Sequence, residues 1–146
     1  MKIKKIDKSS ELDKYGIESV VKFLHKHLEE YGDKKKAIRE AINYSFSEKE
    51  GKGGFLLLGL EKDKIIGAVV INKTGMKHYI PENILVYIST HKKRRGQGLG
   101  TKLMKKTIEE TSGNIALHVE EDNPAVGLYK KLGFETKYLE MRYRKD

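Results

Sequence analysis

The sequence predicts one domain of mixed α/β architecture, in which helices cover the faces of a central sheet. Its length of 146 residues and its 38% apolar content are typical of a single compact core. Apolar side chains recur with helical spacing in the first third of the chain. From residue 55 onward, short apolar runs of strand length alternate with helical stretches, and this alternation favours a sheet with helices packed on it.

The first third of the chain predicts one strand followed by two helices. Lys2–Asp7 alternates and is expected to form an edge strand. Apolar residues at helical spacing then predict one helix over residues 17–28 and another over 37–46. We expect Gly32 to end the first helix and Asp33 to cap the second.

Three strands are expected in the middle of the chain. Phe55–Leu60 and Ile65–Ile71 are apolar runs joined by four charged residues, a pattern that predicts a hairpin of two buried strands. Ile84–Ile88 is a third run of the same kind.

The last third predicts a helix over Thr101–Thr111, a strand over Ile115–Val119 and a helix over Asn123–Leu132. Leu139, Met141 and Tyr143 alternate with polar residues and predict a final strand. The predicted order is therefore β-α-α-β-β-β-α-β-α-β.

Composition excludes several classes of protein. The absence of cysteine excludes a disulfide scaffold, a thiolate metal site and a cysteine nucleophile. His25 and His27 are too close in sequence to form a helical metal-binding pair, so no metal site is expected. Neither a signal peptide nor a membrane span is expected, which favours a soluble, cytoplasmic protein. The net charge of +9 favours anionic partners without choosing one.

Arg95–Lys102, with the sequence RGQGLGTK, lies between a predicted strand and a predicted helix. Glycines let the backbone approach a ligand closely, and the helix that follows offers unpaired N–H groups to a phosphate. The glycine spacing fits neither the Walker loop nor the dinucleotide fingerprint G-x-G-x-x-G. The alternative for this segment alone is a tight turn beside a solvated basic run.

A second informative segment runs from Asp122 to Phe134, with the sequence DNPAVGLYKKLGF. Asn123 is expected to cap the helix and Gly133 to end it in the left-handed conformation. Tyr129 has two interpretations at this stage: a functional phenol, or one more half-buried tyrosine among the eight in the chain.

Together the two segments resemble the GNAT superfamily of N-acetyltransferases. Arg95-x-x-Gly98-x-Gly100 is similar to the superfamily's acyl-CoA pyrophosphate loop, [R/Q]-x-x-G-x-[G/A]. The stretch from Asn123 to Phe134 is similar to its second motif, N-x-x-A-x-x-L-Y-E-K-L-G-F, with one residue fewer between Asn123 and Tyr129 and with Lys130 in place of the glutamate. The resemblance implies one domain over residues 1–146, with a mixed, mostly antiparallel central sheet flanked by helices on both faces.

The resemblance also implies roles for individual residues. Tyr129 would donate a proton to the departing thiolate of CoA. Backbone amides of the glycine loop would hold the pyrophosphate, and the strand before the loop would pair with the pantetheine arm and supply an oxyanion donor. The cofactor-binding residues implied in this way are Ile88, Ser89, Thr90, Arg95, Gly96, Gln97, Gly98, Leu99, Gly100, Thr101 and Asn123.

The general base is less directly indicated. His118 stands where some GNAT protein N-acetyltransferases have a glutamate, and imidazole is a suitable base near neutral pH. The alternative is a strand histidine without a catalytic role. Glu120 is a second candidate for the base.

The function implied is transfer of an acetyl group from acetyl-CoA directly to a primary amine of a small molecule or a protein N-terminus. The alternative is a CoA-binding regulatory or partner module of the same fold that does not catalyse turnover. A third interpretation takes Lys92–Arg95 as a nucleic-acid-binding patch. The resemblance places the acceptor pocket between the two N-terminal helices and Asn72–Asn83. The identity of the amine and the choice between monomer and homodimer stay open.

Overall fold

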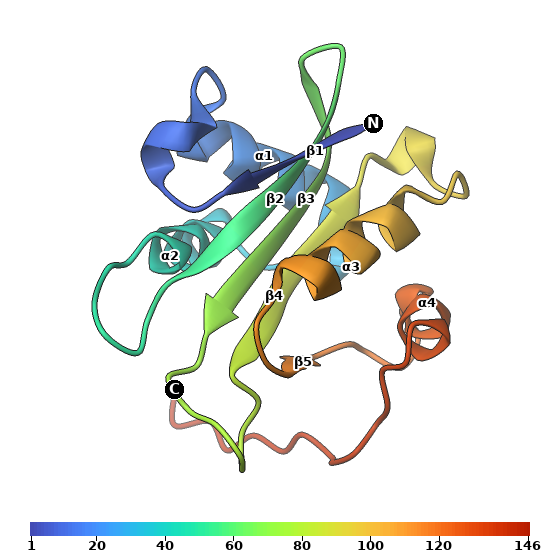
Figure 1. Cartoon of the computed structure of the whole chain (residues 1–146). Coiled ribbons are helices and arrows are strands. Elements are labelled where there is room, and N and C mark those ends of the chain that lie inside the picture. Colours follow the sequence, from blue (N-terminus) through green and yellow to red (C-terminus); the bar gives the residue numbers. More distant parts are fainter.

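The protein folds around a five-stranded sheet whose spatial order is the same as its order in sequence, β1-β2-β3-β4-β5 (Figure 1). This computed structural model describes all residues from 1 to 146. Neighbouring strands are antiparallel except β4 and β5, which are parallel. The strands are β1 (Lys2–Ile6), β2 (Gly54–Glu61), β3 (Lys64–Lys73), β4 (Asn83–Thr90) and β5 (Ile115–Leu117).

Helices cover both faces of this sheet, as the sequence predicts. Figure 1 shows α3 in front of the sheet with α4 beside it, and α1 and α2 behind it. Short 3₁₀ turns occupy residues 9–12, 29–31 and 92–94. The helices are α1 (Gly16–Leu28), α2 (Lys35–Ser45), α3 (Leu99–Glu110) and α4 (Ala125–Lys131).

Two apolar layers form the core, one on each face of the sheet. The α1/α2 layer contains Val20, Leu24 and Ile42 against Leu56 and the other residues of the strands that face them. The second layer joins residues of α3 and α4 to the opposite face. Because β2 and β3 are buried on both faces, their sequences are continuous apolar runs rather than alternating ones. The mixed α/β fold class is confirmed.

β4 contains a bulge that divides it into two parts. Its register against β3 shifts because Ile71 pairs with Leu85 while Val70 pairs with Tyr87, which leaves Val86 as the extra residue. β5 pairs only with Asn83–Leu85, before the bulge. From Val86 onward, the edge of β4 that faces away from β3 has no partner strand.

The predicted final strand is wrong. Residues 132–146 contain no strand, and Leu139, Met141 and Tyr143 are each more than 85% exposed. The alternating pattern is present, but β5 is only three residues long and offers too short an edge to hold a further strand of the chain.

Other boundaries also differ from the sequence predictions. β5 ends at Leu117, so His118 lies in the loop after the strand. Asp33 does not cap α2, whose N-cap is Lys34 without a side-chain hydrogen bond, because the Asp33 carboxylate accepts a hydrogen bond from the Tyr87 hydroxyl at 2.6 Å instead. None of the helices combines the length and apolar content required to cross a bilayer.

Candidate active site

A continuous row of free backbone donors follows β4. No N–H group from Gly96 to Thr101 donates a hydrogen bond within the protein, and the first bond of α3 runs from Lys102 N to Gly98 O at 3.1 Å. No side chain caps this helix. The three N–H groups of its first turn and the positive end of its dipole therefore face the same space as the loop donors, an arrangement that suits a phosphate.

Glycine is required in this loop by conformation. Gly96 and Gly98 have φ of 78° and 79°, in the left-handed region that other residues rarely adopt. A Cβ atom built at either position would meet no atom within 4 Å, so the space in front of the loop is open. The two glycines thus turn their N–H groups toward space that a ligand can enter.

The arginines before the loop attach it to the rest of the protein. Arg94 forms a bidentate ion pair with Glu61 of β2, at 2.5 and 3.1 Å, and also donates to Gln97 Oε1 at 2.9 Å. Arg95 donates to Glu29 Oε1 at 2.9 Å and to the carbonyl oxygen of His27. In this structure the side chains of Arg94, Arg95 and Gln97 hold the loop in place.

His27, at the end of α1, also positions this loop, and its ring is almost fully buried. Its Nδ1 accepts a hydrogen bond from the backbone N–H of Lys92 at 3.1 Å, and its ring packs on His91 with centroids 4.1 Å apart. Burial lowers the pKa of His27 to about 4, and the nearby positive charges of Lys26, Lys92 and Arg95, together with His91, act in the same direction. His27 is therefore neutral in the folded protein, as an acceptor must be.

We expect stability to fall on acidification because of His27. Well above pH 6.5 the ring is neutral in both the folded and the unfolded state and contributes no pH dependence. Between about pH 6.5 and 4 the unfolded chain binds a proton that the folded chain does not, which costs on the order of 2–3 kcal/mol by pH 4. Thermal unfolding of wild type and His27→Asn at pH 7 and pH 4 measures this loss, which should be smaller in the variant.

The exposed His25, two residues earlier on α1, supplies the matched control. His25→Asn should leave the pH dependence of the unfolding midpoint as it is in the wild type. Equal acid sensitivity of the wild type and His27→Asn would show that His27 does not titrate in this way.

The unpaired edge of β4 leads directly to the loop. His91 N donates to Ile66 O on β3 at 2.8 Å, so by strand alternation Ser89 also directs its N–H and C=O toward β3. The corresponding groups of Ile88 and Thr90 then face the edge that β5 leaves open. Of the three predicted residues on this strand, Ile88 and Thr90 offer free backbone groups and Ser89 does not.

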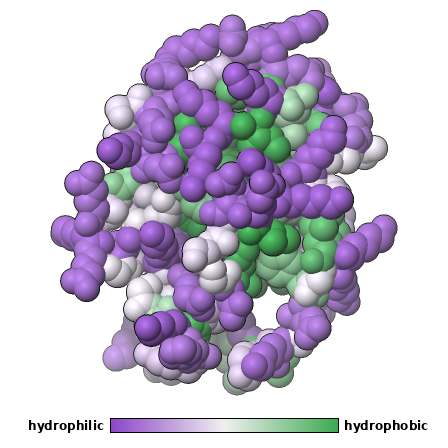
Figure 2. All heavy atoms as spheres, viewed as in Figure 1, coloured by the Kyte–Doolittle hydropathy of each residue, from purple (hydrophilic) through white to green (hydrophobic).

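Tyr129 of α4 lies in the apolar layer on the α3 side of the sheet, where its ring packs at 5.9 Å from that of Phe134. The side chain is 8% exposed, and burial alone raises the pKa of its hydroxyl to about 12. The phenol is consequently protonated throughout the neutral range. Figure 2 shows apolar side chains reaching the surface on the side where Figure 1 places α3 and α4. The partly buried apolar residues packed against the layer that contains Tyr129 include Ile88, Leu117, Ala125, Leu128 and Leu132.

The remaining predicted site residues lie in the loop between β5 and α4. Asn123 Oδ1 accepts a hydrogen bond from Ala125 N at 2.9 Å, so Asn123 caps α4 although the helix begins two residues later. His118 is exposed, and its one polar neighbour is Arg142 Nη2, 3.4 Å from Nδ1. Glu120 is exposed as well. The structure gives neither His118 nor Glu120 a hydrogen bond to β4 or α4.

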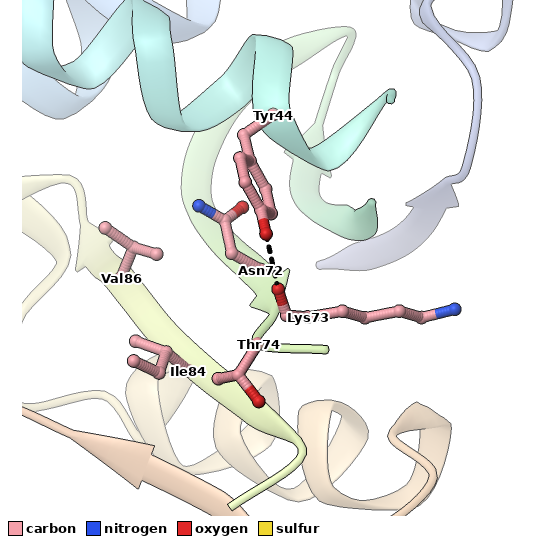
Figure 3. A pocket seen from close by; sticks show the side chains of 6 residues that line it. All are labelled: Tyr44, Asn72, Lys73, Thr74, Ile84 and Val86. Carbon is pink, nitrogen blue, oxygen red and sulfur yellow. Dashed lines mark hydrogen bonds between the residues drawn. The ribbon is translucent and has the colours of Figure 1, made fainter. Parts of the chain in front are cut away.

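An open pocket of about 250 Å³ lies on the α2 side of the sheet, beside the first half of β4. Figure 3 shows Ile84 and Val86 of β4 on one side of it and Tyr44 of α2 on the other, with the Tyr44 hydroxyl donating to Lys73 O at 2.8 Å. Asn72 and Thr74 complete the lining. The pocket thus joins the second helix to the Asn72–Asn83 segment, two of the three parts expected to form an acceptor pocket, and the first helix does not line it.

Sequence reasoning did not find the residues that hold the loop. His27, Glu29 and Glu61 each lie more than thirty positions from the groups they bind, and their local sequences resemble ordinary surface helix and turn segments. No periodicity or spacing connects them to the glycines, so no signal in a single sequence identifies them.

Comparison with known proteins agrees with this geometry. Residues 52–136, more than half of the chain, match the family model described as an acetyltransferase (GNAT) domain. The chain belongs to the GNAT acetyltransferase family. This range contains the glycine loop, the open edge of β4 and Tyr129, so every GNAT motif found in the sequence lies inside the match.

Two curated acetyltransferases resemble parts of the chain. A mycothiol acetyltransferase of Corynebacterium jeikeium is 47% identical over 55 residues, which is 34% of this chain and 16% of that protein. An N-alpha-acetyltransferase 30 of Schizosaccharomyces pombe is 29% identical over 85 residues, or 55% of this chain and 57% of that protein. The matches therefore span less than two thirds of either relative.

Solved structures extend the likeness to the whole fold. A GNAT-family acetyltransferase of Streptococcus pneumoniae superposes with a TM-score of 0.64 over 99% of this chain and 98% of its own, at 18% identity. At that identity the superposition supports the GNAT fold alone.

Proposed function

We propose that the protein is an N-acetyltransferase that moves an acetyl group from acetyl-CoA directly to a primary amine. The observation that carries this proposal is the row of free N–H groups from Gly96 to Thr101, beside the unpaired edge of β4. A pyrophosphate can accept hydrogen bonds from the free N–H groups, and the amides of a pantetheine chain can pair with the strand edge. The two groups follow one another in CoA as the loop and the strand edge do in the protein. Membership of the GNAT family supports an acyl-CoA as the ligand.

The donor would bind along the line from the loop to the open edge of β4. Amides of the loop and the first turn of α3 would hold the pyrophosphate, while Ile88 and Thr90 would hydrogen-bond the pantetheine arm as a neighbouring strand does. The thioester end would then lie along the open edge of β4, near the apolar layer that contains Tyr129.

The chemistry is attack of the neutral amine nitrogen on the thioester carbon. The new C–N bond forms, the carbonyl oxygen gains negative charge, and a free N–H of Ile88 or Thr90 would stabilise that charge. The C–S bond then breaks and the sulfur takes the Tyr129 proton. The proton that the attacking nitrogen must lose to become the amide returns the Tyr129 phenolate to its neutral form. Burial raises the pKa of Tyr129, and the same apolar surroundings raise the proton affinity of a thiolate formed beside it. Because both proton affinities rise together, the phenol can still give its proton to the thiolate.

The incoming amine is an ammonium ion at neutral pH and must lose a proton first. We propose that this proton leaves through His118 or Glu120, both of which follow β5 and are exposed to solvent. The acceptor would approach from the α2 side of the sheet, where Tyr44, Ile84 and Val86 line the open pocket. The acceptor is a small molecule carrying a primary amine or a protein N-terminus.

Binding is tested by the thermal unfolding midpoint in the presence of acetyl-CoA, with ATP and NAD as controls that also carry phosphates. At a hundredfold excess over Kd, acetyl-CoA should add about 2.7 kcal/mol to the free energy of unfolding. For a domain near this size the midpoint then rises by roughly 5–10 °C. An equal rise with all three ligands would identify the loop as a general anion site and contradict the proposal.

Release of CoA thiol across a panel of amines then tests catalysis. Turnover with at least one amine is expected. Binding of acetyl-CoA without turnover on any member of the panel would favour a CoA-binding module of the same fold.

The basic run Lys92–Arg95 gives little support to the nucleic-acid interpretation. Two of its four cations form ion pairs with Glu29 and Glu61, which leaves little of the charge expected of a nucleic-acid-binding patch.

A further inference from the structure

The connection between α1 and α2 lies beside the place where β4 and β5 separate. Asp33, in this connection, accepts a hydrogen bond at 2.6 Å from the hydroxyl of Tyr87, which belongs to β4. Two residues earlier, the hydroxyl of Tyr31 donates a hydrogen bond at 3.2 Å to the carbonyl oxygen of Asp122, in the loop that leads from β5 to α4. One short segment thus contacts both β4 and the loop after β5, so it borders the open edge of β4 on both sides.

The Asp33 carboxylate is held through one of its oxygens. Tyr87 is only 7% exposed, and burial, the hydrogen bond to Asp33 and the negative charges of Asp33 and Glu40 raise the pKa of its hydroxyl. The hydroxyl therefore keeps its proton throughout the neutral range and fixes the position of Asp33 Oδ2. Asp33 itself is exposed, and no side chain donates a hydrogen bond to its other oxygen.

The charge of Asp33 is not paired within the protein. The chain carries 30 Lys and Arg residues against 21 Asp and Glu residues, so most carboxylates could find a cation. Lys34, Lys35 and Lys36 follow Asp33 directly, yet none of them forms an ion pair with it. A carboxylate that is exposed, fixed in position and unpaired can make a strong, charge-assisted hydrogen bond to an ammonium ion.

The position of Arg142 shows that a cation is favoured on this side of the molecule. Its Nη2 lies 3.4 Å from Nδ1 of His118, a candidate for the general base. The hydrogen bond and charge of Glu140, and then the charge of Asp33, raise the pKa of this guanidinium. The negative charge of Asp33 therefore acts on the space next to His118, and an ammonium ion bound at Asp33 would lie near the group proposed to take its proton.

The open pocket between α2 and β4 limits what the rest of the acceptor can be. Val86, which precedes Tyr87, lines this pocket together with Ile84 and the ring of Tyr44. None of the six lining residues is acidic, and Figure 3 shows the one charged side chain, Lys73, pointing away from the two β4 residues. Its volume of about 250 Å³ is enough for one ring, since an apolar cavity of about 150 Å³ already holds benzene.

We propose that the acceptor is a primary amine with one positive charge and an apolar substituent, whose ammonium group binds to Asp33 while the substituent occupies the pocket. Tyr87 acts as a positioning residue for Asp33. A small amine and a protein N-terminus with an apolar first side chain share this chemistry. The inference rests on the proposed function, because it names the substrate class of the same site.

Steady-state acetylation of three amines tests the pocket. The amines 2-phenylethylamine, 1,4-diaminobutane and 4-aminobutanoate join the same reactive group to an apolar ring, a second cation and an anion. We expect kcat/KM for 2-phenylethylamine to exceed the other two values by about tenfold or more. Ile84→Thr keeps the β-branched shape of a strand residue and should reduce this preference by about threefold or more. Short peptides that begin with Phe or with Asp then show whether a protein N-terminus is used in the same way.

Asp33→Asn tests the ammonium site. Asparagine keeps an oxygen for the Tyr87 hydroxyl but removes the charge, so KM for each amine should rise about 10–100-fold. We expect kcat, the acetyl-CoA Kd and the unfolding midpoint to stay near their wild-type values. Tyr87→Phe leaves the charge of Asp33 but releases its position, so KM should rise by a smaller factor with kcat unchanged. Asp63→Asn, in the exposed turn between β2 and β3, is the matched control and should keep the wild-type KM.

Failure of this inference and failure of the proposed function give different results. Turnover without a preference among the three amines, or an unchanged KM in Asp33→Asn, would overturn the inference and leave the acetyltransferase activity intact. If no amine is turned over, the proposed function fails, and NMR titration of the protein with 2-phenylethylamine decides the inference from binding alone. Binding that weakens about tenfold or more in Asp33→Asn would support it. No binding, or equal Kd values for the wild type and the variant, would overturn it.

Discussion

Replacement of Tyr129 by phenylalanine is expected to lower kcat by about 10²–10⁴-fold while the affinity for acetyl-CoA stays nearly unchanged. The ring of Tyr129 belongs to the apolar layer against α3, and phenylalanine preserves that packing. The hydroxyl alone is lost, and with it the proton for the departing thiolate. Its raised pKa, about 12, keeps that proton in place up to alkaline pH in the wild-type protein.

Steady-state rates of CoA release, with the acetyl-CoA Kd measured separately by calorimetry, separate chemistry from binding. Tyr143→Phe removes a hydroxyl from a residue that is 88% exposed and lies in the C-terminal segment, outside the candidate site, so it is the matched control and should keep wild-type kinetics. A Tyr129→Phe enzyme with wild-type kcat would remove this phenol from the mechanism. A large loss of acetyl-CoA affinity would assign it to binding instead.

Leu103→Ala should produce the largest loss of stability that we predict, about 2–5 kcal/mol. Leu103 is fully buried on α3, and its Cδ1 lies 2.6 Å from where a Cβ on Gly67 of β3 would be, so it packs directly on the sheet backbone. Truncation leaves a cavity between the sheet and the helix whose N-terminus ends the glycine loop. At roughly 2–4 °C per kcal/mol, the unfolding midpoint would fall by about 4–20 °C.

The neighbouring Met104 is equally buried and gives the control. Met104→Leu conserves volume and should cost less than about 1.5 kcal/mol. Chemical denaturation of the three proteins measures both values. Equal stability of Leu103→Ala and Met104→Leu would mean that α3 moves to fill the cavity. The position of α3 on β3 would then be less rigid than the close contact of Leu103 with Gly67 indicates.

Much of the fold is predictable because it depends on neighbouring residues. Two helices with an apolar stripe, a hairpin of continuous apolar strands and a glycine loop before a helix each have a local signal in the sequence. The sheet order follows that of the chain, so few long connections had to be inferred. The prediction of a final strand is wrong because it depends on distant residues. Alternation at Leu139, Met141 and Tyr143 shows that the segment can form a strand, but not whether the sheet has a free edge to pair with it.

The sequence by itself determined the conformation of the glycine loop, since Gly96 and Gly98 adopt a backbone conformation that glycine permits and other residues resist. Only the tertiary structure decided what surrounds the loop. The contact of His27 with Lys92 spans 65 positions, and that of Asp33 with Tyr87 spans 54. Such pairs form because the sheet brings distant segments together, and a hydrogen bond of this kind leaves no periodicity in either segment. The bulge at Val86 that frees the edge of β4 likewise depends on how β3 and β5 meet that strand.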